Sequence, residues 1–213
     1  MKNYICRYLW FTAGVALNSF GIAFITKASL GTSPISSVPY VLSFELPLTF
    51  GQLSFIMNMF FILGQALILR KDFQPVQLLQ IAVNIIFSGC IDLGMALLSW
   101  FTPGNIAIEL ASLVVGCAVL AVGISVEVAP RVIMVPGEGL VHAISTRFGW
   151  SFGTVKVIFD VSLMATAAIC SFIFFHRLQG LGIGTIVAAL IVGRFVNVAN
   201  KKLPLLPYIR QLS

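Results

Sequence analysis

Ionisable residues are rare in this chain, and three that lie within or beside long apolar stretches are the main candidates for chemistry. Lys156 and Asp160 stand four residues apart, one helical turn, and can pair on one face. Glu138 lies between Gly137 and Gly139, which let backbone or a ligand approach closely. Ionisable groups at membrane depth are functional candidates by default. We assign proton-coupling roles to Glu138, Asp160 and Lys156, with a self-neutralising structural pair as the alternative for the last two.

Two short segments join a proline to small and hydroxyl-bearing residues. Each proline opens an apolar run of about ten residues, and proline suits the first helical position because its missing N–H has no partner there. The first N–H groups of a helix are unpaired and carry the positive end of its dipole, so two such starts suit an anionic or strongly polar group. The predicted substrate site comprises Gly31, Thr32, Ser33, Pro34, Pro136, Gly137, Glu138 and Gly139.

A polar stripe runs down the third apolar stretch at spacings of three and four residues. Its members are Gln77, Gln80, Asn84, Ser88 and Asp92. Such stripes either hold helices together or line water, and the length of this one favours lining. We therefore add Asn84 to the substrate site. Asn58 joins it because it matches Asp160 in the internal repeat described below. Glu127 ends an apolar stretch and is expected at the membrane interface.

Composition places these residues in a membrane protein. Apolar residues make up 59% of the chain and charged residues 9%, and the mean hydropathy is +1.02, which excludes a soluble fold. The net charge of +6 indicates no nucleic-acid partner, because Lys and Arg sit mostly at segment ends. The four scattered cysteines predict neither a metal site nor a disulfide, and we expect no cofactor. Six apolar stretches are long enough to cross a bilayer: 8–26, 50–70, 77–99, 106–128, 152–174 and 181–200.

The chain repeats itself at an offset of 102 positions. This offset superposes glycines and prolines in both halves: Gly14 on Gly116, Gly21 on Gly123, Pro34 on Pro136, and Phe50-Gly51 on Phe152-Gly153. We predict a first membrane repeat over residues 1–103 and a second over 104–213, forming one integrated transmembrane domain.

Charge placement favours six spans over eight. In each repeat a segment, 28–49 or 129–151, is too short to cross, and we predict a re-entrant half-helix there. Six spans with a cytoplasmic N-terminus leave nine basic residues inside and two outside, whereas eight spans divide them six to five. The predicted fold is an all-α integral membrane protein with two inverted-topology repeats, each of three transmembrane helices plus one re-entrant half-helix, and both termini cytoplasmic.

Two further motifs carry a family resemblance. At Gly31-Thr32-Ser33-Pro34, and at 181–185 leading into 190–193, the chain resembles the YitT/YczE-type bacterial membrane proteins. The resemblance spans nearly the whole chain and implies a bacterial inner-membrane protein with a transport function. Members often carry a Gly-Pro-Trp-Asp-like run at the first half-helix. This chain has Ser33-Pro34-Ile35-Ser36 instead, and its acidic position is Glu138.

These features favour a secondary transporter of a small polar or anionic solute across the bacterial inner membrane, with proton coupling as part of the hypothesis. A channel, the substrate-binding subunit of a multi-subunit vitamin transporter, and an accessory membrane protein are the alternatives. An enzyme is disfavoured because the sequence holds no hydrolase or zinc-protease motif. The expected partners are the solute and the lipid bilayer, and a homodimer remains open.

The charge bias makes a topological prediction. A cysteine placed at Gly104, in a variant without the native cysteines, should react with an impermeant thiol reagent when the inner membrane is intact. A cysteine at Lys71 should react only after that membrane is opened. The reverse pattern would contradict the inverted-repeat topology.

Overall fold

Six long helices dominate the protein. The computed structural model describes residues 2–211, and no strand occurs in that range. Six of its helices are long and apolar enough to cross a membrane, which confirms the six predicted spans and makes the chain an all-α, multi-pass membrane protein. They are α1 (Lys2–Lys27), α3 (Phe50–Leu69), α4 (Leu79–Leu97), α5 (Ile106–Val128), α7 (Phe152–Phe175) and α8 (Ile183–Lys202).

Short helices occupy the remaining segments. The 3₁₀ turn η1 (Pro34–Ser36) leads into α2 (Ser37–Leu42), and α6 spans Pro136–Phe148, so both units begin at the predicted prolines. The 13 residues of α6 cover about 20 Å, less than the roughly 30 Å of a hydrocarbon core. The others are η2 (Arg70–Asp72), η3 (Pro75–Leu78) and α9 (Leu205–Gln211).

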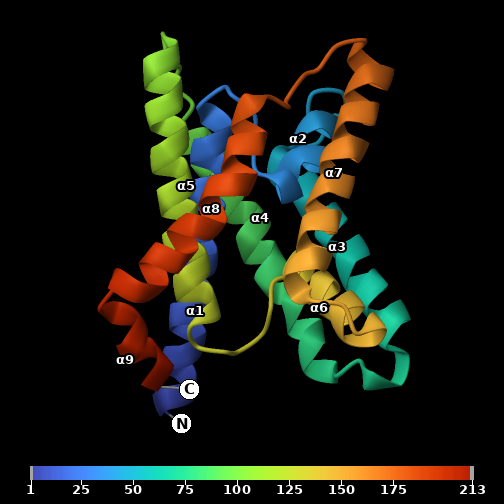
Figure 1. Cartoon of the computed structure of the whole chain (residues 1–213), viewed down its shortest axis with the longest axis vertical. Helices are drawn as coiled ribbons and strands as arrows, with labels where there is room; N and C mark the ends of the chain where they lie inside the picture. The colour runs from blue at the N-terminus through green and yellow to red at the C-terminus, as the bar shows by residue number, and fades with distance from the viewer. Residues whose placement is uncertain (1, 212–213) are drawn as a thin grey trace.

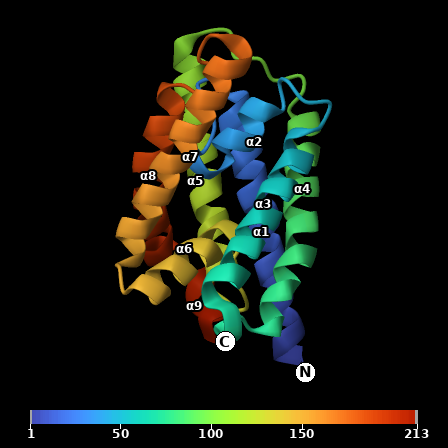
Figure 2. The ribbon, with the colours of Figure 1, turned by 90° about the vertical axis from the view of Figure 1, so that its right-hand side faces the viewer.

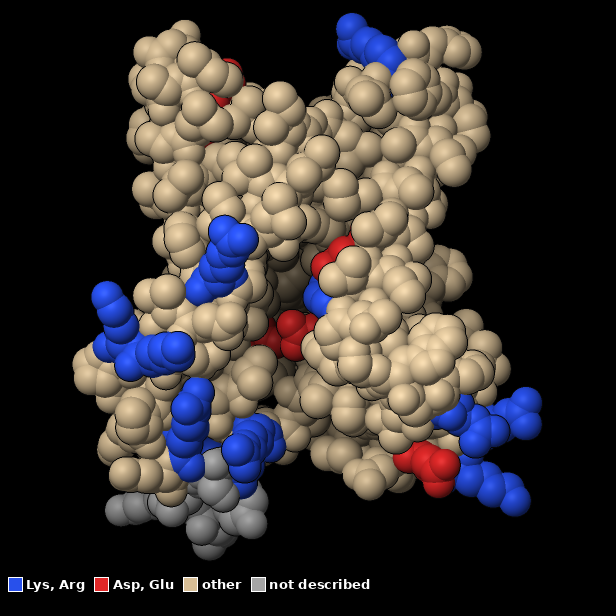
Figure 3. Space-filling model, viewed as in Figure 1, with Lys and Arg blue, Asp and Glu red and all other residues tan. Residues whose placement is uncertain are grey.

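The two ends of the molecule differ in what they hold. Both termini lie at one end, together with α6 and the α3–α4 connection, whereas α2 and the α4–α5 connection lie at the other (Figures 1 and 2). On the face shown in Figure 3, most Lys and Arg side chains gather toward the end that holds the termini. The short helices α2 and α6 therefore sit toward opposite ends of the bundle.

Helices α1 and α5 make the most extensive helix pair in the protein. Glycines allow the close approach, because a Cβ at Gly21 would collide with the backbone of Leu120 and one at Gly123 with the backbone of Asn18. The offset of 102 that relates Gly21 to Gly123 also relates Asn18 to Leu120. A second exchanged pair of contacts lies further along the two helices: Gly14 with Glu127, and Gly116 with Ile25.

The other helix pairs also occur as matching contacts in the two halves of the sequence, with one exception. Helix α4 packs on α1 as α8 packs on α5, and α6 packs on α3 as α2 packs on α7. The exception is that α3 packs against α4, whereas α7 and α8 make almost no contact. A gap between α7 and α8 is therefore the main departure from symmetry.

The buried core lies on either side of this gap. One cluster joins α1, α4, α5 and α8 around Ile25, Ile91 and Leu113, and a second joins α2, α3 and α7 around Val41 and Phe61. The outer surfaces of the long helices expose large apolar side chains instead, as lipid contact requires.

Substituting Gly21 by leucine should destabilise the protein by about 3 kcal/mol or more, because the side chain would be forced into the backbone of α5. The matched control is Gly89→Leu on α4, where a Cβ has no heavy atom within 4 Å. The readout is the thermal midpoint in detergent, followed by fluorescence-detected size exclusion. Equal midpoints for the two variants would show that the α1–α5 crossing does not limit stability.

Candidate functional site

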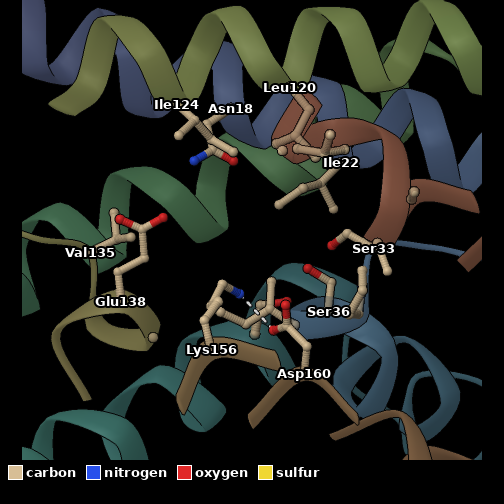
Figure 4. Close-up of a pocket in the computed structure, with 18 of the residues that line it drawn as sticks. Asn18, Ile22, Ser33, Ser36, Leu120, Ile124, Val135, Glu138, Lys156 and Asp160 are labelled. Atoms are coloured by element: carbon tan, nitrogen blue, oxygen red, sulfur yellow. Dashed lines mark hydrogen bonds and ion pairs between the residues drawn. The ribbon is translucent and has the colours of Figure 1, made fainter. Parts of the chain in front are cut away.

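A cavity of about 360 Å³ lies between two groups of helices, each of which draws on both halves of the sequence. One wall comes from α1, α5 and α8 and is apolar apart from Asn18. The opposite wall comes from η1, α3, α6 and α7 and carries the charged and hydroxyl side chains (Figure 4). Seven of the residues predicted for substrate binding or coupling line it: Ser33, Pro34, Asn58, Gly137, Glu138, Lys156 and Asp160.

The charged side chains of this cavity come from α6 and α7. Lys156 Nζ donates to Asp160 Oδ1 at 2.6 Å, so the ion pair expected from their spacing forms, with side chains 30% and 20% exposed. Glu138 lies in the first turn of α6 and faces the same space (Figure 4). It forms no ion pair with the side chains of residues 5–211, although Lys156 and Asp160 lie within its electrostatic reach. Its negative charge is therefore not neutralised by a direct partner.

A second acidic residue, Glu127, lies close to this site, and the sequence-based expectation that it is interfacial is wrong. Glu127 is only 2% exposed, and Asn18 Nδ2 donates to its Oε2 at 2.8 Å. It also lies within electrostatic reach of Glu138. Asn18 lines the cavity, so it connects Glu127 to the site. The available signal was Asn18, a lone amide in the middle of the first apolar stretch.

Ser33 presents an unused hydroxyl to the cavity. Its side chain is 3% exposed, and its Oγ has no hydrogen-bond partner among the described residues. It stands at the N-cap position of η1 but does not cap it, and the hydroxyl points into the open space (Figure 4). A buried polar group without a partner costs about 1–3 kcal/mol, so this hydroxyl is suited to bind a ligand or a water molecule.

Gly31 and Thr32 lie beside the cavity and help to close it. Thr32 Oγ1 lies 2.7 Å from Thr26 Oγ1, and its backbone N–H donates to Thr185 Oγ1 at 3.2 Å. Gly31 has a φ of +119° and packs on Thr185, an arrangement that a residue with a Cβ would not fit. The N–H of Gly184 donates to the carbonyl of Leu30 at 2.8 Å. These bonds join the segment before η1 to the start of α8.

Pro136 and Gly139 anchor α6 to α3 and do not line the cavity. Gln65 Nε2 donates to the carbonyl of Pro136 at 3.0 Å, and Gly139 packs against the same glutamine side chain. Gln65 and Gln80 exchange two hydrogen bonds of 3.0 Å. Both predicted residues therefore position Glu138 instead of contacting a solute.

The polar stripe of α4 bonds to α3, so the lining role predicted for Asn84 is wrong. Asn84 accepts a 2.8 Å hydrogen bond from Asn58 Nδ2 and donates to the carbonyl of Phe55 at 3.0 Å. At the other end of the helix, Asp92 accepts from the N–H of Gly51 at 2.7 Å and from Thr49 at 2.6 Å. These hydrogen bonds hold α4 against α3, and Asn84 does not line the cavity.

Comparison with known proteins identifies a family. A family model matches residues 5–201 of the chain. The protein belongs to DUF6198, a family of unknown function. No curated protein and no solved structure matches the chain. Membership in DUF6198 assigns no activity, so the function has to be argued from the cavity.

The Gln65–Gln80 pair should contribute about 1 kcal/mol to stability, the scale measured for interhelical hydrogen bonds in membranes. A double-mutant cycle with Gln65→Met and Gln80→Met tests it by thermal or denaturant unfolding in detergent. We expect the double variant to lose less stability than the sum of the single variants. Additive losses would show that the two amides act independently.

Proposed function

We propose that this DUF6198 protein is a secondary transporter of a small polar solute across the bacterial inner membrane, with Glu138 as the proton-coupling group. The observation that carries the proposal is the cavity between the two groups of helices, with charged side chains and an unpartnered Ser33 hydroxyl. The resemblance to YitT/YczE-type proteins agrees with this proposal.

The proposal includes inverted repeats. The exchanged contacts of Gly21 with Leu120 and Gly123 with Asn18 are those expected from a two-fold relation between antiparallel helices. The short helices α2 and α6 lie toward opposite ends and start at prolines related by the same offset (Figure 1). Both pack against α3 and α7, and irregular backbone at membrane depth requires such protein contacts or access to water. Substrate sites of such transporters lie where the repeats meet.

The orientation follows from the basic residues. The end that holds the termini also holds the connections and helix ends that carry Arg70, Lys71, Arg131 and Arg147. The opposite end carries Lys27 and Arg177. Basic residues near span ends stay on the cytoplasmic side, so we place both termini in the cytoplasm.

Closure at one end favours a carrier over a channel. The bonds that join Leu30 and Thr32 to the start of α8 form a seal on the side that we place outside. A channel needs a pathway open to both sides, whereas a carrier exposes its site to one side at a time. A closed outer end beside the cavity fits a carrier, which exposes its site to one side at a time.

Glu138 is the residue best placed for coupling. It faces the cavity without an ion-pair partner, whereas Asp160 is held by Lys156. A carboxyl that exchanges between proton and solute links the two gradients.

Glu138→Gln should abolish accumulation driven by a pH gradient. A thermal-shift screen of the purified protein against metabolites would first supply a stabilising compound, whose labelled form is then followed in proteoliposomes. We expect at least a tenfold loss of pH-driven accumulation, because glutamine cannot titrate. The control, Glu45→Gln, removes an exposed carboxylate and should behave as wild type.

Two outcomes would contradict the proposal. Accumulation with wild-type dependence on the pH gradient in both Glu138→Gln and Asp160→Asn would exclude coupling through this site. Equilibration without accumulation in the wild-type protein would indicate a channel.

A further inference from the structure

The ionisable side chains around the cavity include more acidic than basic groups. Lys156 forms an ion pair with Asp160, while Glu138 and Glu127 form none with the side chains of residues 5–211. Ionised, these four side chains carry an excess of two negative charges. The amide of Asn18 satisfies one oxygen of Glu127 without changing that balance.

The helix start at Pro136 does not reverse this balance. Glu138 lies in the first turn of α6, where its own carboxylate interacts favourably with the positive end of the helix. The other short unit, η1 with α2, is too brief to add a comparable dipole. The helix starts that suggested an anionic solute therefore leave no net positive site for one.

The wall opposite Glu138 and the Lys156–Asp160 pair is apolar apart from Asn18. Helix α8 contributes Ala188, Ala189 and Val192, and α1 and α5 contribute Ile22 and Leu120. A fully hydrated inorganic ion would leave this wall in contact with water, whereas an organic body would cover it. The unpartnered Ser33 hydroxyl, 3% exposed and directed into the same space, is independent evidence that the cavity holds a ligand.

The gap between α7 and α8 is encoded in the sequence. Gln65 and Asn84 bond α3 to α4. Ala167 of α7 matches Gln65 at the offset of 102, and Ala188 of α8 matches Asn84 at an offset of 104, which aligns the last span of each half. Alanine offers no polar group, so these two helices have no corresponding bonds to hold them together. Figure 3 shows a hollow in the surface between α8 and α7, with acidic and basic side chains visible inside it.

The borders of the gap face the membrane. Val157 of α7 lines the cavity and is 62% exposed, and Ala189 and Gly193 of α8 line it and are exposed as well. In a bilayer, lipid chains cover such side chains, so the gap leads from the acyl region to the carboxylates. A molecule with an apolar body concentrates in that region by the hydrophobic effect.

Building on the proposed transport function, we infer that the transported solute is an organic cation with an apolar body, which enters from the bilayer through the α7–α8 gap. Its charge pairs with Glu138 and its body covers the wall formed by α1, α5 and α8. Proton and cation then compete for one carboxylate, so transport exchanges them. The groups that face Glu138 and modulate this competition are Glu127 on α5 and Lys156 and Asp160 on α7.

A matched pair of probes tests the charge. Benzyltrimethylammonium and phenylmethanesulfonate share a benzyl group, carry opposite charges and dissolve in water. Isothermal titration of the purified protein in detergent should show binding of the ammonium that tightens as pH rises, and no binding of the sulfonate. Glu138→Gln should weaken ammonium binding about tenfold or more, and Glu45→Gln should leave it unchanged.

A matched pair of glycines tests the entry route. Gly193 of α8 lines the cavity and Gly89 of α4 lies outside it, and a Cβ at either position has no heavy atom within 4 Å. Gly193→Trp should slow uptake of labelled benzyltrimethylammonium into proteoliposomes about tenfold or more, because the indole would fill the cavity mouth. Gly89→Trp should transport at the wild-type rate and shows that a tryptophan on a spanning helix is tolerated.

The outcomes separate this inference from the transport proposal. Binding of the sulfonate in preference to the ammonium, or unchanged ammonium binding in Glu138→Gln, would overturn the cationic solute. Uptake by Gly193→Trp at the wild-type rate would overturn the entry route. In both cases, loss of pH-driven accumulation of the screened compound in Glu138→Gln would still support a proton-coupled transporter.

Discussion

The close crossing of α1 and α5 is the constraint on which the rest of the structure depends. Helices in a bilayer gain no hydrophobic free energy by associating, so they adhere where small residues let backbones touch. Gly21 and Gly123 provide that contact, each beneath the backbone of the other helix. The crossing holds Asn18 against Glu127 and gives α4 and α8 their docking surfaces.

The two halves use equivalent surfaces for different purposes. In the first half, amides and a carboxylate of α3 and α4 satisfy one another, and the interface is closed. In the second half, Asp160 matches Asn58 at the offset of 102 and Ala188 matches Asn84 at an offset of 104, and the interface is open. Polar groups that pair across helices support the scaffold, whereas those left facing a gap become available to a ligand. Divergence at a few positions thus closes one helix interface and leaves the other open, beside a cavity that both halves line.

Carboxyl groups at this depth are acceptable because the protein supplies partners or solvent access. Asn18 donates to Glu127 and Lys156 donates to Asp160, while Glu138 faces the cavity from the start of α6. A buried carboxylate loses the free energy of its hydration, and hydrogen bonds or ion pairs must compensate for that loss. Ser33 has no such compensation within the described residues, so the same reasoning marks it as a ligand contact.

The sequence by itself determined the features that depend on the chain's local order. Apolar length set the six spans, Pro34 and Pro136 set the short helix starts, and a spacing of four set the Lys156–Asp160 pair, because each reflects backbone geometry over a few residues. Only the tertiary structure decided which helix faces which. The polar stripe of α4 is compatible with lining water or with bonding another helix, and its contact with α3 decides for bonding. Glu127 lies near the end of its span in sequence, but the structure buries it beside Asn18. Periodicity shows that a face is polar but not what lies opposite, since that depends on contacts between residues far apart in the chain.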